Sequence, residues 1–127
     1  MSQKPTVLVV DDSAFMRLAL VHLLTKNGYE VVGEAADGQQ AIDFCRLTPP
    51  QLVTMDIVMP NLDGLEALRQ IKKLDRGIRV VMVSAMGERK SVMEALGAGA
   101  DNFLVKPFDE TKLLRVLSAL DFGTPAP

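Results

Sequence analysis

Cysteine and tryptophan are scarce in this 127-residue sequence, which contains one cysteine and no tryptophan. A single cysteine excludes an intrachain disulfide framework and is typical of a protein from a reducing compartment. Because Cys45 lies among apolar positions of a predicted helix, we expect a packed thiol and not a nucleophile. Hydrophobic residues make up 48% of the chain, so an ordinary hydrophobic core can stabilise it.

An excess of charge is also missing, since the formal net charge is −2. So mild an imbalance gives no electrostatic reason to expect direct binding of nucleic acid or of a membrane surface. No apolar run approaches the length of a membrane span, and none precedes the first predicted strand. We therefore expect a cytoplasmic protein that neither inserts into a membrane nor binds nucleic acid directly.

Strand-like and helix-like patterns alternate five times along the chain. Apolar, largely β-branched runs predict strands at residues 6–10, 29–35, 52–55, 79–83 and 102–105. Helical spacing and capping residues predict helices over about residues 13–27, 39–47, 88–98 and 109–120. A further helix after Gly64 turns Leu65, Leu68 and Ile71 inward.

This alternation predicts an α/β fold with parallel strands joined by right-handed crossovers. The expected architecture is a flavodoxin-like, doubly wound (βα)5 domain with a five-stranded parallel sheet in the order 2-1-3-4-5. We expect one domain over residues 1–127, with a core from about 6 to 120. Residues 121–127, which are rich in Pro and Gly, are expected to form a flexible tail.

Polar side chains follow four of the five predicted strands: Asp11 and Asp12, Asp56, Ser84, and Lys106. Ligands of open α/β sheets bind at this carboxyl edge. Three carboxylates repel one another there, and a hard divalent cation such as Mg²⁺ relieves that repulsion. A lone Asp after a strand is usually a cap or a turn residue, but the ordered set favours a magnesium-dependent site.

The same set suits phosphoryl transfer. Lys106 supplies a point charge and Ser84 a hydroxyl donor for an incoming phosphate. An aspartate can act as the nucleophile, and the reaction needs mainly positioning and charge neutralisation. The set therefore predicts a site at which an aspartate could accept a phosphoryl group.

Five motifs in this order resemble the response-regulator receiver family: VVDDS at 9–13, MDIVMP at 55–60, LDG at 62–64, VSA at 83–85 and VKPF at 105–108. The resemblance covers about residues 6–120. Within the family, the chain is most similar to single-domain chemotaxis regulators of the CheY type, or to the receiver half of chemotaxis methylesterases.

The resemblance implies that Asp56 accepts the phosphoryl group. It implies that Asp12 and Asp56 bind Mg²⁺ directly, that Asp11 binds it through water, and that the backbone carbonyl of Val58 is a further ligand. A histidine kinase or a histidine phosphotransfer domain would be the donor. Such a protein is a switch that catalyses its own modification and not a turnover enzyme.

By the same resemblance, Ser84 and Lys106 bind the phosphoryl oxygens, aided by the backbone N–H groups of Val58 and Ala85. Ser84 would then move, and Phe103 would turn inward. That change would repack the face of the fourth helix, fifth strand and fifth helix for an output protein. Phe103 as an immobile core aromatic is the alternative.

Two further expectations concern the loops. The resemblance implies that Pro107 is a candidate cis-proline, which would aim Lys106 at the site. Val58 and Met86 lack the amide or acid that helps to orient an attacking water in fast-dephosphorylating relatives. We therefore expect the phosphoryl group on Asp56 to be lost slowly.

Three other functions remain open at this point. A magnesium-dependent phosphatase of the haloacid-dehalogenase type would place a second Asp two residues after its nucleophile and add a cap domain. A flavodoxin-like carrier would need a long phosphate-binding loop after the first strand. The third alternative is a receiver-shaped interaction scaffold that is never phosphorylated.

Overall fold

A computed structural model describes residues 4–120 and 122. The strands are β1 (Thr6–Val10), β2 (Glu30–Ala35), β3 (Leu52–Met55), β4 (Arg79–Ser84) and β5 (Asn102–Val105). The helices are α1 (Ala14–Lys26), α2 (Gly38–Leu47), α3 (Gly64–Leu74), α4 (Arg89–Gly97) and α5 (Glu110–Ser118). All neighbouring strands are parallel in the order β2-β1-β3-β4-β5, which confirms the predicted fold.

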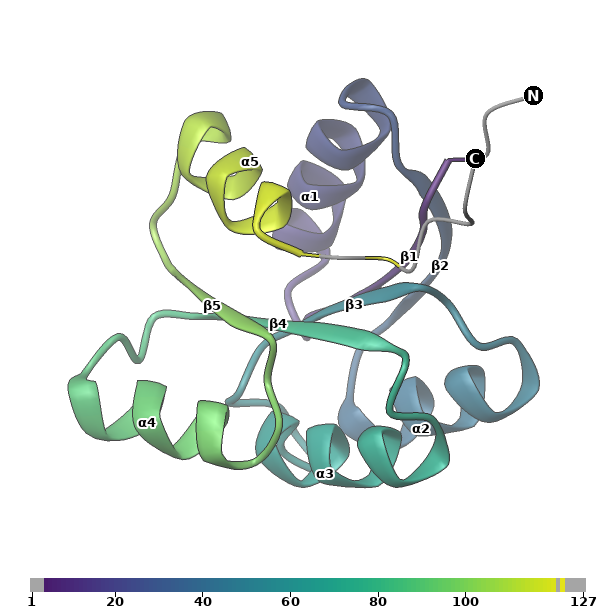
Figure 1. Ribbon diagram of the computed structural model, residues 1–127, viewed down its shortest axis with the longest axis vertical. Coiled ribbons are helices and arrows are strands. Elements are labelled where there is room, and N and C mark those ends of the chain that lie inside the picture. Colours follow the sequence, from purple (N-terminus) through teal and green to yellow (C-terminus); the bar gives the residue numbers. More distant parts are fainter. Residues whose placement is uncertain (1–3, 121, 123–127) are drawn as a thin grey trace.

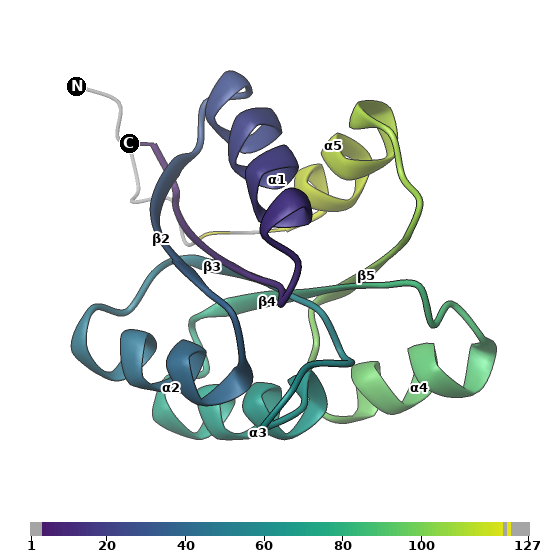
Figure 2. The ribbon, with the colours of Figure 1, turned by 180° about the vertical axis from the view of Figure 1, so that it is seen from behind.

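Helices cover both faces of the sheet, with α1 and α5 on one side and α2, α3 and α4 on the other (Figures 1 and 2). The alternation of side chains along β1 explains why both faces are apolar. Val7 and Val9 pack in the cluster that includes Leu20 of α1, whereas Leu8 and Val10 pack in the cluster that includes Leu68 of α3. The unbroken apolar run of β1 is thus the signature of a strand buried on both faces.

Four of the helices begin with a side-chain cap. The capping oxygens of Ser13, Asp37, Asp63 and Asp109 accept backbone N–H groups of the first turns of α1, α2, α3 and α5. Each such cap contributes about 1 kcal/mol to stability. The predicted ranges of α1, α4 and α5 begin at the N-cap residues Ser13, Glu88 and Asp109. In the structure these helices begin one residue later, because a cap lies just outside the helix.

Helix α4 is the exception. Its N-cap, Glu88, makes no side-chain capping bond, and Ala95 is its one buried residue. Met93 and Leu96 expose 57% and 44% of their surface. Few buried contacts and a missing cap make α4 the helix that is easiest to displace.

Small differences at the predicted boundaries have local causes. Strand β2 begins at Glu30 because the N–H of Tyr29 still donates to the carbonyl of Leu24, 3.0 Å away, at the end of α1. Helix α5 ends at Ser118, before a tight turn in which the N–H of Leu120 donates to Leu117.

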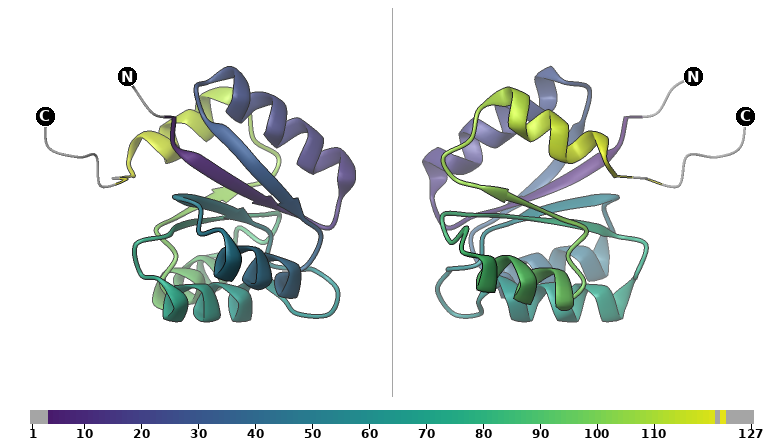
Figure 3. Two further views of the ribbon diagram at one scale, coloured as in Figure 1. Left: turned by 90° about the vertical axis from the view of Figure 1, so that its right-hand side faces the viewer. Right: turned by 60° about the vertical axis from the view of Figure 1, so that its left-hand side comes forward.

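Helices α1 and α5 lie side by side on the sheet (Figure 3), joined by a 2.8 Å hydrogen bond from Asn27 to Glu110. The tail predicted at 121–127 lies outside the described residues, apart from Phe122. The ring of Phe122 packs edge-on against that of Tyr29, with the two ring centroids 6.2 Å apart. In the part of the chain that is described, no helix is long and apolar enough to span a bilayer.

Candidate functional site

Three carboxylates meet at the carboxyl edge of the sheet. Asp11 and Asp12 follow β1, and Asp56 follows the neighbouring strand β3, where Val10 pairs with Met55. Backbone hydrogen bonds continue the ladder, since the N–H of Asp56 donates to the carbonyl of Val10 at 3.1 Å. One carboxylate oxygen from each Asp lies within 4.8 Å of the other two, so the predicted acidic cluster forms.

Lys106 reaches this cluster from β5, across the end of β4. Its Nζ donates to Oδ2 of Asp11 at 2.7 Å and to Oδ2 of Asp56 at 3.2 Å. The Lys106 side chain is 16% exposed and that of Asp11 only 1%. Burial alone would lower the pKa of Lys106, but the hydrogen bond to Asp11 and the charges of both carboxylates outweigh it and raise the pKa.

The remaining oxygens of the two buried acids are also engaged. Oδ1 of Asp11 accepts the N–H of Ser13 at 2.9 Å, and Oδ1 of Asp56 accepts the N–H of Ile57 at 2.7 Å. Asp12 is exposed. These contacts fix the orientation of Asp11 and Asp56, while Asp12 faces solvent.

Ser84 lies at the end of β4, buried to 1% exposure. Its hydroxyl oxygen accepts the N–H of Met86 at 3.2 Å, and its carbonyl accepts the N–H of Lys106 at 2.9 Å. The hydroxyl is therefore bound within its own loop, which also carries the exposed Ala85. Because a serine hydroxyl can accept one hydrogen bond and donate another, the bond from Met86 leaves the O–H of Ser84 able to donate to an oxygen bound near Asp56.

The β3–α3 loop, residues 57–63, carries Val58, which is 62% exposed. Gly64 closes this loop, because its N–H donates to the carbonyl of Ile57 at 2.8 Å. A Cβ at Gly64 would overlap the backbone carbonyl of Asp56, so only glycine fits there. The close approach of Asp56 to the start of α3 thus depends on the glycine of the LDG motif.

Two other predicted residues lie on β5 and after it. Phe103 pairs with Met82 and is partly buried against the core on the α2–α3–α4 side. The peptide bond between Lys106 and Pro107 is cis, as expected.

Arg17 is a residue of the site that the motif analysis did not assign. Its Nη1 donates to the backbone carbonyl of Asp11 at 2.7 Å, and its Nε donates to Oε1 of Glu34 at 3.0 Å. Arg17 lies one helical turn after the Ser13 cap, so its side chain can return to the preceding loop. That spacing, five residues after Asp12, is the sequence signal that would have identified it.

Comparisons with known proteins agree with this geometry. The family model described as "Response regulator receiver domain" matches residues 7–118. The chain is 47% identical to chemotaxis protein CheY of Bacillus subtilis over 112 residues, which cover 88% of this chain and 93% of that protein.

Two solved structures are also similar. The CheX–CheY–BeF3–Mg²⁺ complex of Borrelia burgdorferi contains a chain that superposes with a TM-score of 0.86 at 37% identity, covering 90% of this chain and 87% of that one. The response regulator domain of Thermotoga maritima CheB superposes with a TM-score of 0.80 at 40% identity. The match covers 92% of this chain and 91% of that domain. On these grounds, the chain belongs to the response regulator receiver domain family.

Proposed function

We propose that this protein is a phosphorylation-activated switch of a two-component system of the chemotaxis type, with Asp56 as the phosphoryl acceptor. A histidine kinase or a histidine phosphotransfer domain supplies the phosphoryl group, and the protein acts in the cytoplasm. Receiver domains are signalling switches and not turnover enzymes. The observation that carries the proposal is the contact of Lys106 with Asp56 inside a cluster of three carboxylates.

The charges of the cluster support a Mg²⁺ site. Three carboxylates and the one ammonium group of Lys106 leave two negative charges, which a divalent cation neutralises. Asp11, Asp12, Asp56 and the carbonyl of Val58 would hold the ion, because oxygen ligands suit Mg²⁺. When bound, Mg²⁺ supplies charge neutralisation at the transferred phosphoryl group. The similar CheX–CheY–BeF3–Mg²⁺ complex of Borrelia burgdorferi supports this proposal.

The chain's own groups account for the transfer. An oxygen of Asp56 forms the new bond to phosphorus, while the bond from phosphorus to the donor atom breaks and the donor leaves with that electron pair. The N–H of Ile57 holds the other oxygen of Asp56, so the attacking carboxylate keeps one orientation. Lys106, already beside Asp56, stabilises the negative charge on the phosphoryl oxygens.

Phosphorylation then gives Lys106 and Ser84 a new set of acceptors. The Ser84 hydroxyl moves toward the phosphoryl group, and the β4–α4 loop, whose Met86 N–H donates to that hydroxyl, moves with it. This loop leads into α4, which lacks a side-chain cap and is weakly buried. Phe103 turns inward, and the surface formed by α4, β5 and α5 changes shape for an output protein.

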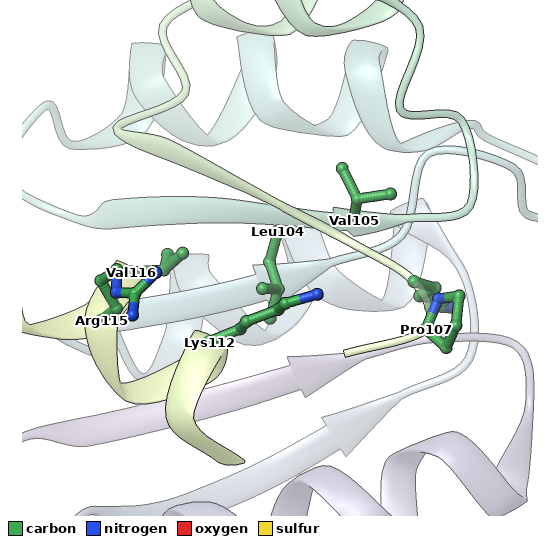
Figure 4. A pocket seen from close by; sticks show the side chains of 7 residues that line it. Leu104, Val105, Pro107, Lys112, Arg115 and Val116 are labelled. Carbon is green, nitrogen blue, oxygen red and sulfur yellow. The ribbon is translucent and has the colours of Figure 1, made fainter. Parts of the chain in front are cut away.

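The chemistry of that surface indicates the kind of output partner. A groove between β5 and α5 is lined by Leu104, Val105, Lys106, Pro107, Lys112, Arg115 and Val116 (Figure 4). Its apolar floor and the cations of Lys112 and Arg115 suit a partner segment that combines apolar and acidic side chains.

The phosphoryl group is lost slowly in this proposal. Val58 and Met86, which flank the site in the loops after β3 and β4, expose 62% and 41% of their surface. Neither side chain accepts a hydrogen bond strongly, so neither can hold an attacking water in line with phosphorus.

One experiment tests the function directly. The chain and its Asp56→Asn variant are exposed to acetyl phosphate with and without Mg²⁺, and intact mass and beryllofluoride binding are measured. We expect one added phosphoryl group in the unmodified chain only, and only with Mg²⁺. Absence of both the adduct and beryllofluoride binding would leave the unphosphorylated scaffold as the better description.

A further inference from the structure

The buried Asp37 and the exposed Asn61 form a hydrogen-bonded link between the start of α2 and the β3–α3 loop. Asp37 is 8% exposed and precedes α2 as its N-cap, with Oδ1 accepting the N–H of Gln40 at 2.8 Å. Its Oδ2 accepts the side-chain amide of Asn61 at 2.8 Å. The bonds from the N–H of Gln40 and from the amide of Asn61 hold the pKa of Asp37 below its ordinary value, so the carboxylate is ionised at neutral pH.

A second contact joins the same two segments. The N–H of Gly38 donates to the carbonyl of Leu62 at 3.2 Å, and a Cβ at Gly38 would overlap that carbonyl. Asn61 itself has a positive φ of 68°, a conformation that Asn tolerates better than most residues. The loop thus takes an uncommon backbone conformation at the residue whose side chain is bound by Asp37.

The loop is held by hydrogen bonds near both ends and by the buried side chain of Met59 in its middle. One anchor is the bond from Gly64 to Ile57 beside Asp56, and the other is the pair of contacts from α2 to residues 61 and 62. Between these hydrogen bonds, Val58 is 62% exposed, whereas Met59 packs in the hydrophobic core.

We propose that Asp37 and Asn61 are positioning residues for phosphoryl transfer, which fix the β3–α3 loop so that the backbone of Val58 is presented to Asp56. This inference rests on the proposed function, in which the carbonyl of Val58 helps to hold the metal ion. Backbone groups act in a site only when their loop is held in one geometry before the reaction. Capping α2 requires only one oxygen of Asp37, and the second oxygen binds Asn61.

Exchange of the donor and acceptor tests the link. The N61D variant keeps a residue that tolerates positive φ but sets two carboxylates against each other. The D37N variant keeps an N-cap residue, and its amide can bond to the Asn61 amide once that group rotates. The double variant D37N/N61D restores the hydrogen bond with donor and acceptor exchanged.

The matched control is Q39E. It adds the same negative charge as N61D and also opposes two carboxylates, because Gln39 donates to Asp43 on the exposed face of α2. Gln39 and Asp43 make no contact with the β3–α3 loop among the described side-chain hydrogen bonds.

The measurement is the rate of phosphorylation by acetyl phosphate as a function of Mg²⁺ concentration, at a temperature well below each variant's thermal midpoint. We expect N61D to reduce the maximal rate by about tenfold, since small displacements of positioned groups cost about that much or more. The double variant should return to within about twofold of the unmodified chain, and Q39E should not differ from it.

A structural role alone would lower the thermal midpoint of N61D and leave the rate of the folded protein unchanged. That result, or a double variant as slow as N61D, would overturn the inference. An unmodified chain that takes up no phosphoryl group would instead overturn the proposed function, and this inference with it.

Discussion

The Nζ atom of Lys106 lies 2.7 Å from Oδ2 of Asp11, closer than the 3.2 Å that separates it from Oδ2 of Asp56. Asp11 is almost completely buried, so the ammonium group is the main compensation for that carboxylate. Lys106 therefore neutralises the acidic cluster, and in the proposed function it also binds the phosphoryl group.

The first prediction concerns Lys106→Ala. Without the ammonium group, three carboxylates face one another uncompensated, so we expect a loss of about 1–3 kcal/mol in unfolding free energy in the presence of EDTA. Mg²⁺ should recover most of that loss, because a cation again occupies the cluster. Urea unfolding with EDTA and with Mg²⁺ measures both effects. An equal loss in the two conditions would contradict the assigned role.

The fold was predictable because each strand carries its own signal. The run at β1 is apolar on both faces, and the caps Ser13 and Asp109 lie where the sequence indicates them. Asp11, Asp12, Asp56 and Lys106 were predictable as a site because parallel strands end at one edge, which converts sequence order into proximity.

The remaining contacts depend on pairs that are distant in sequence. The link from Asp37 to Asn61 joins two loops, and neither residue alone departs from ordinary turn chemistry. The engagement of the Ser84 hydroxyl with Met86 depends on the backbone path after β4. Sequence pattern indicates which residues reach an edge, but not which of several acceptors a side chain uses there.

The second prediction is that Val58→Asn with Met86→Glu accelerates loss of the phosphoryl group from Asp56. An amide and a carboxylate at these exposed positions can orient the attacking water, and we expect an increase of at least about tenfold. Decay of the phosphorylated form is followed by intact mass after removal of acetyl phosphate. Val105→Asn, a change of an exposed valine outside both loops, is the control and should leave decay unchanged.

The third prediction concerns Cys45, whose thiol pKa burial raises to about 12. The side chain is 2% exposed, so iodoacetamide should react at pH 8 only through unfolding, at least about a hundredfold more slowly than in urea. Unfolding returns the pKa to about 8.5, so the unfolded chain releases a proton that the folded chain keeps. Stability should therefore fall as pH rises above about 8.5, and less so in Cys45→Ala. Alkylation of Cys45 in the folded protein as fast as in urea would contradict the burial of this thiol.

The fourth prediction separates two effects of Arg17, whose guanidinium joins the carbonyl of Asp11 to Glu34. If Arg17 acted only through its charge, Arg17→Ala would tighten Mg²⁺ binding, because a cation near the acidic cluster is removed. If it holds the β1–α1 loop, the same change should weaken binding, by about tenfold as for other residues that orient metal ligands.

We expect the weaker binding, measured as the Mg²⁺ concentration that gives half-maximal phosphorylation by acetyl phosphate. Arg17→Lys should recover only part of the affinity, because an ammonium group lacks the planar fork that reaches two acceptors in fixed directions. Arg46→Ala, which removes an exposed ion pair with Asp43 on α2, should leave the Mg²⁺ dependence unchanged. Tighter Mg²⁺ binding in Arg17→Ala would show that the charge of Arg17 outweighs its hydrogen bonds, and that the β1–α1 loop keeps its geometry without them.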